Sequence, residues 1–167
     1  MGMNAQLKNN IEEQLEKWLR GASKIVVLGI GNTLRKDDGV GVMIVKTMTG
    51  KVSKKVQLIQ AETLPESFTA NIRQANPSHI LLVDAGEFDG IPGETRLVEG
   101  DNVDGLAIST HSIPLRIMTK FLEKTTQAKV ALLAIQPRLI EFGEGLSPEL
   151  EKATLQISQI LMRRFPE

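Results

Sequence analysis

Three side chains that can do chemistry stand far apart in this 167-residue chain: Asp38, Asp84 and His111. Asp38 follows an apolar run, residues 25–30, after a glycine-containing turn, and Asp84 closes a second apolar run. Two carboxylates and one imidazole are the oxygen and nitrogen donors that bind a divalent transition metal and leave coordination positions open. The residue types therefore predict a small hydrolase in which these three residues are both the metal-contacting and the catalytic groups.

The elements that must position these residues are strands and helices in alternation. Short β-branched runs at about residues 24–30, 55–60, 79–84 and 128–135 are followed by turns and, usually, by segments of helical period. The runs are continuously apolar, which is typical of strands covered on both faces. The segment 93–98 follows the third strand too closely for a helical crossover and is expected to pair antiparallel at an edge. The pattern predicts a doubly wound three-layer α/β/α fold with a mostly parallel five-stranded sheet and one antiparallel edge strand.

Such a sheet binds ligands beyond the carboxyl ends of its strands. Asp38 comes just past the first strand and Asp84 ends the third, so both carboxylates are expected at this edge. His111 lies in the connection after the edge strand, which can return to the same edge. His79 precedes the third strand, so it is expected at the opposite edge in a structural or exposed role. Glu62, after the second strand, is expected as a solvated loop acid or as a residue that lines a substrate groove.

Residues 1–22 are predicted to be an N-terminal amphipathic helix extension, and residues 23–167 a single α/β domain. The extension is expected to pack on the flank of the domain or to present a dimer or partner surface. The later helices are predicted from apolar stripes at Val40, Ile44 and Met48, at Phe68, Ile72 and Ala75, and at Ile113, Ile117 and Phe121, and from a Ser147 cap followed by Pro148.

Composition excludes several classes of protein. Lys plus Arg equals Asp plus Glu at 20 each, so no basic field would attract nucleic acid. The chain has no cysteine, which rules out disulfides, thiolate ligands and a cysteine nucleophile. Its longest apolar runs fall far short of the roughly 20 residues that a membrane span needs. A soluble, cytoplasmic protein without a membrane span is expected.

Other interpretations use some of the same residues. The Gly29-Ile30-Gly31 turn is similar to a dinucleotide fingerprint but has Leu34 at the third glycine position, and the aspartate pair would repel a pyrophosphate. Asp37 and Asp38 also suit a helix start, where an acid contributes about 0.3–1 kcal/mol, although one aspartate is enough. A two-aspartate protease dyad would leave the histidine unused. A serine triad through Ser109 or Ser112 places the nucleophile next to its own base.

Six short motifs in order carry a resemblance to a known family. They are Leu28-Gly29-Ile30-Gly31-Asn32, Asp37-Asp38-Gly39-Val40-Gly41, Leu82-Val83-Asp84-Ala85, Pro92-Gly93-Glu94, Thr110-His111-Ser112-Ile113-Pro114 and Ala134-Ile135-Gln136-Pro137. In this order and spacing the chain resembles the hydrogenase maturation endopeptidases from about residue 24 to 165. The segment 60–63 departs from the acidic, glycine-rich turn that relatives often carry there.

The resemblance implies an aspartate-containing peptidase that removes a C-terminal peptide from the large-subunit precursor of a [NiFe] hydrogenase after nickel insertion. It places the metal-binding residues at Asp38, Asp84 and His111 and implies that the precursor supplies the nickel, with no nucleotide cofactor. The expected partners are that precursor and hydrogenase maturation chaperones. Two alternatives stay open: a stand-alone zinc-dependent hydrolase on the same three residues, and a non-enzymatic metal-binding maturation chaperone.

Overall fold

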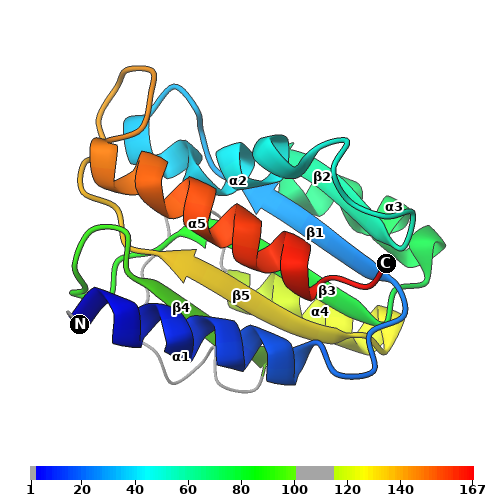
Figure 1. Ribbon diagram of the computed structural model, residues 1–167. Coiled ribbons are helices and arrows are strands. Elements are labelled where there is room, and N and C mark those ends of the chain that lie inside the picture. Colours follow the sequence, from blue (N-terminus) through cyan, green and yellow to red (C-terminus); the bar gives the residue numbers. More distant parts are fainter. Residues whose placement is uncertain (1–2, 101–114) are drawn as a thin grey trace.

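The central sheet has five strands in the order β2-β1-β3-β5-β4 (Figure 1). The computed structural model describes residues 3–100 and 115–167. The strands are β1 Ile25–Ile30, β2 Val56–Glu62, β3 His79–Ala85, β4 Thr95–Glu99 and β5 Lys129–Ile135. β2, β1, β3 and β5 pair in parallel, and β4 pairs antiparallel with β5 at one edge. The predicted fold class is confirmed, including the antiparallel edge strand.

Helices cover both faces of this sheet. They are α1 Met3–Trp18, α2 Val40–Met48, α3 Thr69–Ala75, α4 Leu115–Thr126 and α5 Pro148–Arg164, with 3-10 turns η1 Lys36–Gly39 and η2 Pro65–Phe68 before α2 and α3. One core contains Ile25 and Val27 of β1 with residues of α1, α2 and α5. The other contains Val26 and Leu28 with residues of α3 and α4. Successive side chains of one buried strand thus enter the two cores in turn, which is why the central strands are apolar without alternation.

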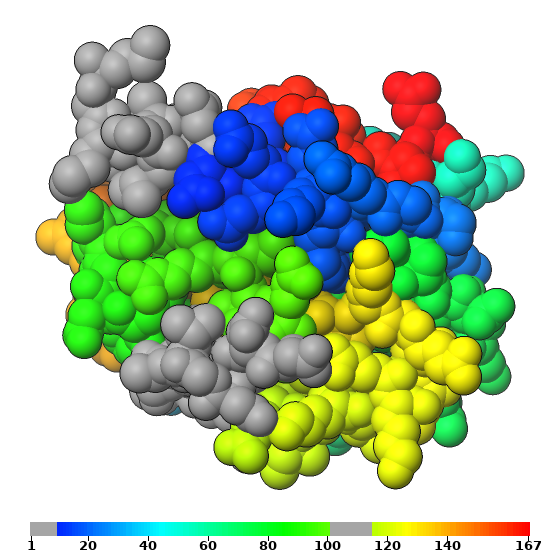
Figure 2. Space-filling model, turned by 90° about the horizontal axis from the view of Figure 1, so that it is seen from below, coloured from blue at the N-terminus to red at the C-terminus, as the bar shows by residue number. Residues whose placement is uncertain are grey.

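The N-terminal helix α1 packs beside α5 and β4. Ile11, Leu15 and Trp18 are buried in the same core as the inner face of α5. Figure 2 shows the face where α1, the segment before residue 100 and α4 reach the surface. Ion pairs also link the two helices, because the Glu12 carboxylate of α1 accepts from Arg163 and Arg164 of α5 at 3.3 and 3.1 Å. The packing of this helix is thus observed, whereas the division of the chain at residue 22 stays a prediction.

One local prediction about a helix is wrong. Ile117 and Phe121 do not form the buried stripe of α4: they are 65% and 44% exposed, and the core side chains are Leu115, Met118 and Leu122. The helical period is the same, but the buried face is rotated, because packing against the sheet decides which stripe is covered. Ser147 is the N-cap residue of α5 and Pro148 follows in the first turn, as predicted, but the Ser147 side chain makes no capping hydrogen bond, and its hydroxyl donates to Asp37. Ile113 lies outside the described residues.

None of the helices in the described part of the chain is long and apolar enough to cross a membrane.

Candidate functional site

The turn between β1 and α2 brings Asp38 against the neighbouring strand β3. Gly31 has φ 133°, and a Cβ there would overlap the main-chain carbonyl oxygen of Asp38. A Cβ on Gly41 would overlap the carbonyl oxygen of Val83, the residue before Asp84. Only glycine permits such close approach of one backbone to another. These glycines therefore let the start of α2 lie directly on β3 and place the two aspartates of the predicted site on adjacent segments.

Asp38 and Asp84 both lie at the carboxyl edge of the sheet. Asp38 is in η1, just past β1, and its Oδ2 accepts from the backbone N–H of Asn32 at 2.9 Å. Asp84 is the penultimate residue of β3, in register with Ala134 of β5. Their exposed fractions are 6% and 1%. Burying a carboxylate costs free energy unless it is paired, hydrogen-bonded or bound to a metal, so each of these two side chains needs such a partner.

The third predicted member of the site, His111, lies outside the described residues, so its meeting with the two aspartates stays a prediction. In the ranges that the structure covers, no group of three His, Cys, Asp or Glu side chains is placed to hold a metal ion. Two carboxylates alone provide hard oxygen ligands. A third donor, or ligands carried by a substrate, would have to complete a transition-metal site.

Asp37, next to Asp38 in sequence, has a different task. It is fully buried, and its Oδ2 accepts from the N–H groups of Arg138 and Leu139 at 2.9 and 3.0 Å and from the hydroxyl of Ser147 at 2.8 Å. Its Oδ1 accepts from the N–H of Ser147 at 2.7 Å. Four donors on one carboxylate make a strong, charge-assisted network. Asp37 therefore ties the 138–147 segment to the turn that carries Asp38.

The tethered segment is fastened at other points as well. Lys36 N–H donates to the Gly143 carbonyl at 2.9 Å, and Gly143 N–H donates to the Leu34 carbonyl at 2.8 Å. Arg138 also forms a 2.9 Å ion pair with Glu149 in the first turn of α5. The pKa of Glu149 is lowered, first by the hydrogen bond from its own backbone N–H and then by Arg138. The loops after β1 and β5 thus form one connected unit.

Gln136 organises the loop that follows Asp84. It comes directly after β5, and its Oε1 accepts from the N–H groups of Phe88 and Gly90 at 2.9 and 3.1 Å. Its Nε2 donates to Glu87 at 2.6 Å. One buried side chain therefore fixes the path of the backbone just beyond β3. We regard Gln136 as a positioning residue for this edge of the sheet.

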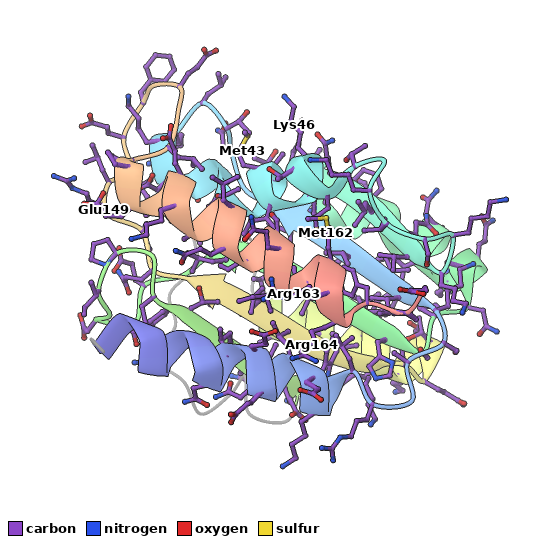
Figure 3. All side chains as sticks on the ribbon, in the orientation of Figure 1. Met43, Lys46, Glu149, Met162, Arg163 and Arg164 are labelled. Atoms are coloured by element: carbon purple, nitrogen blue, oxygen red, sulfur yellow. The ribbon has the colours of Figure 1, made fainter. Side chains whose placement is uncertain are left out.

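A cleft with both charged and apolar lining residues adjoins the turn that carries Asp38. It has a volume of about 360 Å³ and lies between the first turns of α2, the end of β2 and residues 144–146. Met43 and Lys46 line it from α2 (Figure 3), and Glu62 lines it from the end of β2. Glu62 is exposed and therefore fits both expectations, a solvated loop acid and a groove residue.

His79 lies at the opposite, amino-terminal edge, as predicted. It is 3% exposed, its Nε2 lies 3.0 Å from the Trp18 carbonyl oxygen, and its Nδ1 lies 2.9 Å from the Ser78 hydroxyl. The Trp18 ring contacts the imidazole edge-on at a centroid distance of 5.0 Å. Burial lowers the pKa of His79, against the Trp18 hydrogen bond, which raises it. The histidine is therefore a structural link between β3 and the end of α1.

Known proteins share both this sequence pattern and this fold. Residues 42–164 match the family model described as hydrogenase maturation protease. The chain belongs to the hydrogenase maturation protease family. It is therefore a peptidase that acts in the processing of hydrogenases.

Individual relatives agree with this assignment. A Methanocaldococcus jannaschii protein that carries the name of a hydrogenase maturation protease is 35% identical over 140 residues, which are 79% of this chain and 83% of the relative. The hydrogenase 3 maturation protease of Escherichia coli is 27% identical over 137 residues, 81% of this chain and 87% of the relative. The crystal structure of the [NiFe] hydrogenase maturation protease HycI from Thermococcus kodakarensis superposes with a TM-score of 0.83 at 28% identity and covers 90% of this chain and 97% of that one.

The sequence predicted the placement of Asp38 and Asp84 at the carboxyl edge, but it did not reveal what Asp37 and Gln136 do. A second adjacent aspartate, more than a helix cap requires, was the available signal for Asp37. For Gln136, the signal was a polar residue directly after a buried strand and before a proline. Neither signal tells which distant backbone groups these side chains bind.

Proposed function

We propose that this protease removes the C-terminal peptide from a [NiFe] hydrogenase large-subunit precursor after nickel insertion, and that the substrate's nickel is recognised by Asp38, Asp84 and His111. The observation that carries the proposal is the placement of two buried carboxylates, Asp38 and Asp84, on adjacent segments of the carboxyl edge in a member of this protease family.

The two adjacent aspartates differ in the hydrogen bonds that they already make. Within the described residues, Asp37 accepts four, whereas one is found at the side chain of Asp38, from Asn32. A carboxylate offers about four lone-pair sites. Asp38 thus keeps acceptor capacity for a substrate group, and Asp37 does not. This contrast supports Asp38 as the member of the pair that meets the substrate.

The chemistry asked of these residues is hydrolysis of one peptide bond. A water molecule attacks the scissile carbonyl carbon, a base takes a proton from that water, and the leaving amine gains a proton as the carbon–nitrogen bond breaks. A carboxylate within hydrogen-bond reach of the water can serve as the base. The nickel carried by the precursor would fix the position of the scissile bond, and a misplacement of about 1 Å can cost on the order of a hundredfold in rate.

The decisive experiment compares nickel-loaded with nickel-free precursor. The purified protein is incubated with each form under metal-free buffer conditions, and release of the C-terminal peptide is followed by mass spectrometry. We expect cleavage of the loaded form alone, because three protein donors are an incomplete ligand shell that a substrate-borne ion completes. Equal cleavage of both forms would refute nickel recognition. A stoichiometric metal that stays with the purified protein would instead favour the zinc-dependent hydrolase.

The role of Asp38 is tested by Asp38→Asn, which keeps the size of the side chain but removes its charge. We expect loss of cleavage with little change in the unfolding midpoint, because the amide oxygen can still accept from Asn32. Asp89→Asn is the matched control, since Asp89 is an exposed aspartate in the loop after β3. Cleavage at the wild-type rate by a folded Asp38→Asn protein would reduce Asp38 to a helix-start residue.

A further inference from the structure

Exposed apolar side chains of this protein gather at one edge of the sheet. The large hydrophobic residues with high exposure in the described part of the chain are Leu34, Leu64, Ile91, Ile117, Phe121, Leu139, Phe142 and Leu155. Five of these eight stand in loops that follow the carboxyl ends of parallel strands: Leu34 after β1, Leu64 after β2, Ile91 after β3, and Leu139 and Phe142 after β5. The described loops at the amino-terminal edge, 19–24, 49–55, 76–78 and 127–128, contribute none.

The asymmetry does not follow from the fold itself. Loops at both edges of the sheet run over the surface, and an exposed apolar side chain gains nothing from water at either edge. Single exposed hydrophobic residues are ordinary, but a grouping beside the candidate site marks an interaction surface. The carboxyl edge is also where Asp38 and Asp84 lie.

Three of these side chains belong to one connected unit, which we call the apolar platform: Leu34, Leu139 and Phe142. The loop after β1 and the loop after β5 run beside each other through the pairing of Arg35 with Gly143 (Figure 1). Asp37 N–H donates to the Leu139 carbonyl at 3.1 Å, and the buried carboxylate of Asp37 holds the same loop from inside. Phe142 nevertheless keeps 86% of its surface exposed.

The construction of the platform favours a binding role. Polar bonds, and not burial of its apolar side chains, hold the loop in place. Because the backbone of this loop is held in place in advance, the loop itself loses less conformational entropy when a partner binds. Apolar and aromatic side chains are also the usual anchors at the centre of protein interfaces.

Resting on the proposed function, we infer that the apolar platform docks the folded body of the hydrogenase large-subunit precursor, and not the peptide that is removed. Only three residues separate Leu34 from Asp38, so a partner whose scissile bond reaches Asp38 lies next to this loop. The neighbouring cleft is a hollow that carries charged groups such as Lys46 and Glu62 beside apolar ones such as Met43, so it can admit an extended peptide, whereas the platform side chains stand exposed on the surface. The partner's contact region is therefore expected to be a folded, apolar surface next to its C-terminus.

The test uses Phe142→Ser and Leu139→Ser, with Leu155→Ser as the matched control because Leu155 is 57% exposed on α5. Cleavage of nickel-loaded full-length precursor is measured over a range of concentrations. Because burial of one such side chain is worth at least a tenfold change in binding, we expect each platform variant to raise KM about tenfold or more. We expect kcat and the unfolding midpoint to be unchanged, and Leu155→Ser to match the wild type.

A second measurement distinguishes binding of the folded large subunit from binding of its C-terminal peptide. Binding of the processed large subunit, which lacks the C-terminal peptide, is measured by titration. We expect the wild-type protein to bind it and Phe142→Ser to bind it at least tenfold more weakly. No binding of the processed subunit by the wild type, or a wild-type KM in both platform variants, would overturn the docking role while wild-type cleavage upholds the proposed function. If the platform variants differ from the wild type only in how strongly the protein associates with itself, the platform binds a second copy of this chain and the docking role is overturned. If the wild type cleaves no precursor, the proposed function falls and the docking role with it.

Discussion

Replacement of Asp37 by asparagine tests whether this buried carboxylate holds the site together. The change keeps size and shape but turns one of the two acceptor oxygens into an NH2 group. If the amide oxygen takes the position of Oδ2, it keeps three donors, from Arg138, Leu139 and the Ser147 hydroxyl. The NH2 group then faces the Ser147 N–H, which donates to Oδ1 at 2.7 Å in the wild type. The side-chain NH2 group and the Ser147 N–H, both donors, would then face each other in a buried space with no acceptor between them.

The expected loss of stability follows from these contacts. One buried donor left unsatisfied costs about 1–3 kcal/mol, and hydrogen bonds to a charged group are worth about 1.5–3 kcal/mol against about 1 kcal/mol for neutral ones. With one bond lost and three weakened, we expect the free energy of unfolding to fall by about 3–5 kcal/mol. For a chain of this size, that is a Tm decrease of about 6–20 °C. The protein should still fold at 25 °C, because domains of this kind have about 5–15 kcal/mol of stability.

Two assays read out the change. Denaturant unfolding gives the free energy, and amide hydrogen exchange reports local opening of residues 138–147 relative to the central strands. Glu141→Gln is the matched control, because it removes one negative charge from an exposed position of the same loop. Ordinary surface substitutions change the free energy of unfolding by no more than about 0.5 kcal/mol. A change that small in Asp37→Asn would refute the conclusion that Asp37 holds residues 138–147 in place. Asp37→Asn and Asp38→Asn should thus separate stability from catalysis at neighbouring positions.

Three further changes have expected outcomes of their own. Gly41→Ala should lower both stability and cleavage, because its Cβ would overlap the Val83 carbonyl oxygen; Gly50→Ala, in open space but also strained by its positive φ, should lower stability without the specific loss of cleavage. Gln136→Leu should lower both the free energy of unfolding and the rate of cleavage, since the N–H groups of Phe88 and Gly90 lose their acceptor and the loop after Asp84 is released. Faster hydrogen exchange at residues 86–90 would report this release. Between pH 8 and pH 5 the free energy of unfolding should fall in the wild type and fall less in His79→Gln.

The sign of the pH effect follows from the lowered pKa of His79. Above its ordinary pKa of 6.5 the imidazole is neutral in both the folded and the unfolded chain, so it adds no pH dependence. As the pH falls below that value the unfolded chain binds a proton and the folded protein does not, which favours unfolding until the lowered pKa is passed. Burial is the main cause of the shift, and Lys129 adds to it. If the free energy of unfolding has the same pH dependence in the wild type and in His79→Gln, this account is wrong. Cleavage at the wild-type rate by Gly41→Ala or by Gln136→Leu would contradict the role given to that residue.

The sequence by itself determined the architecture of this protein. Continuously apolar runs predicted the central strands because a strand covered on both faces has no polar side to show. A short connection predicted that β4 is antiparallel, since a parallel partner needs a long crossover. The order of strands and glycine turns also placed Asp38 and Asp84 at the carboxyl edge and His79 at the other. These features depend on the spacing of apolar residues and on the order of elements along the chain, and both can be read from neighbouring residues.

Only the tertiary structure decided which groups meet across that edge. The partners of Asp37 lie 101 to 110 residues away in the chain, and the N–H groups that Gln136 binds lie 46 and 48 residues away. The buried face of α4 was likewise settled by packing, which left Ile117 and Phe121 in solvent. Residue type reveals that a buried carboxylate or amide needs partners, but the partners themselves depend on how loops after different strands come together. That pairing exists only once the sheet has aligned the ends of its strands.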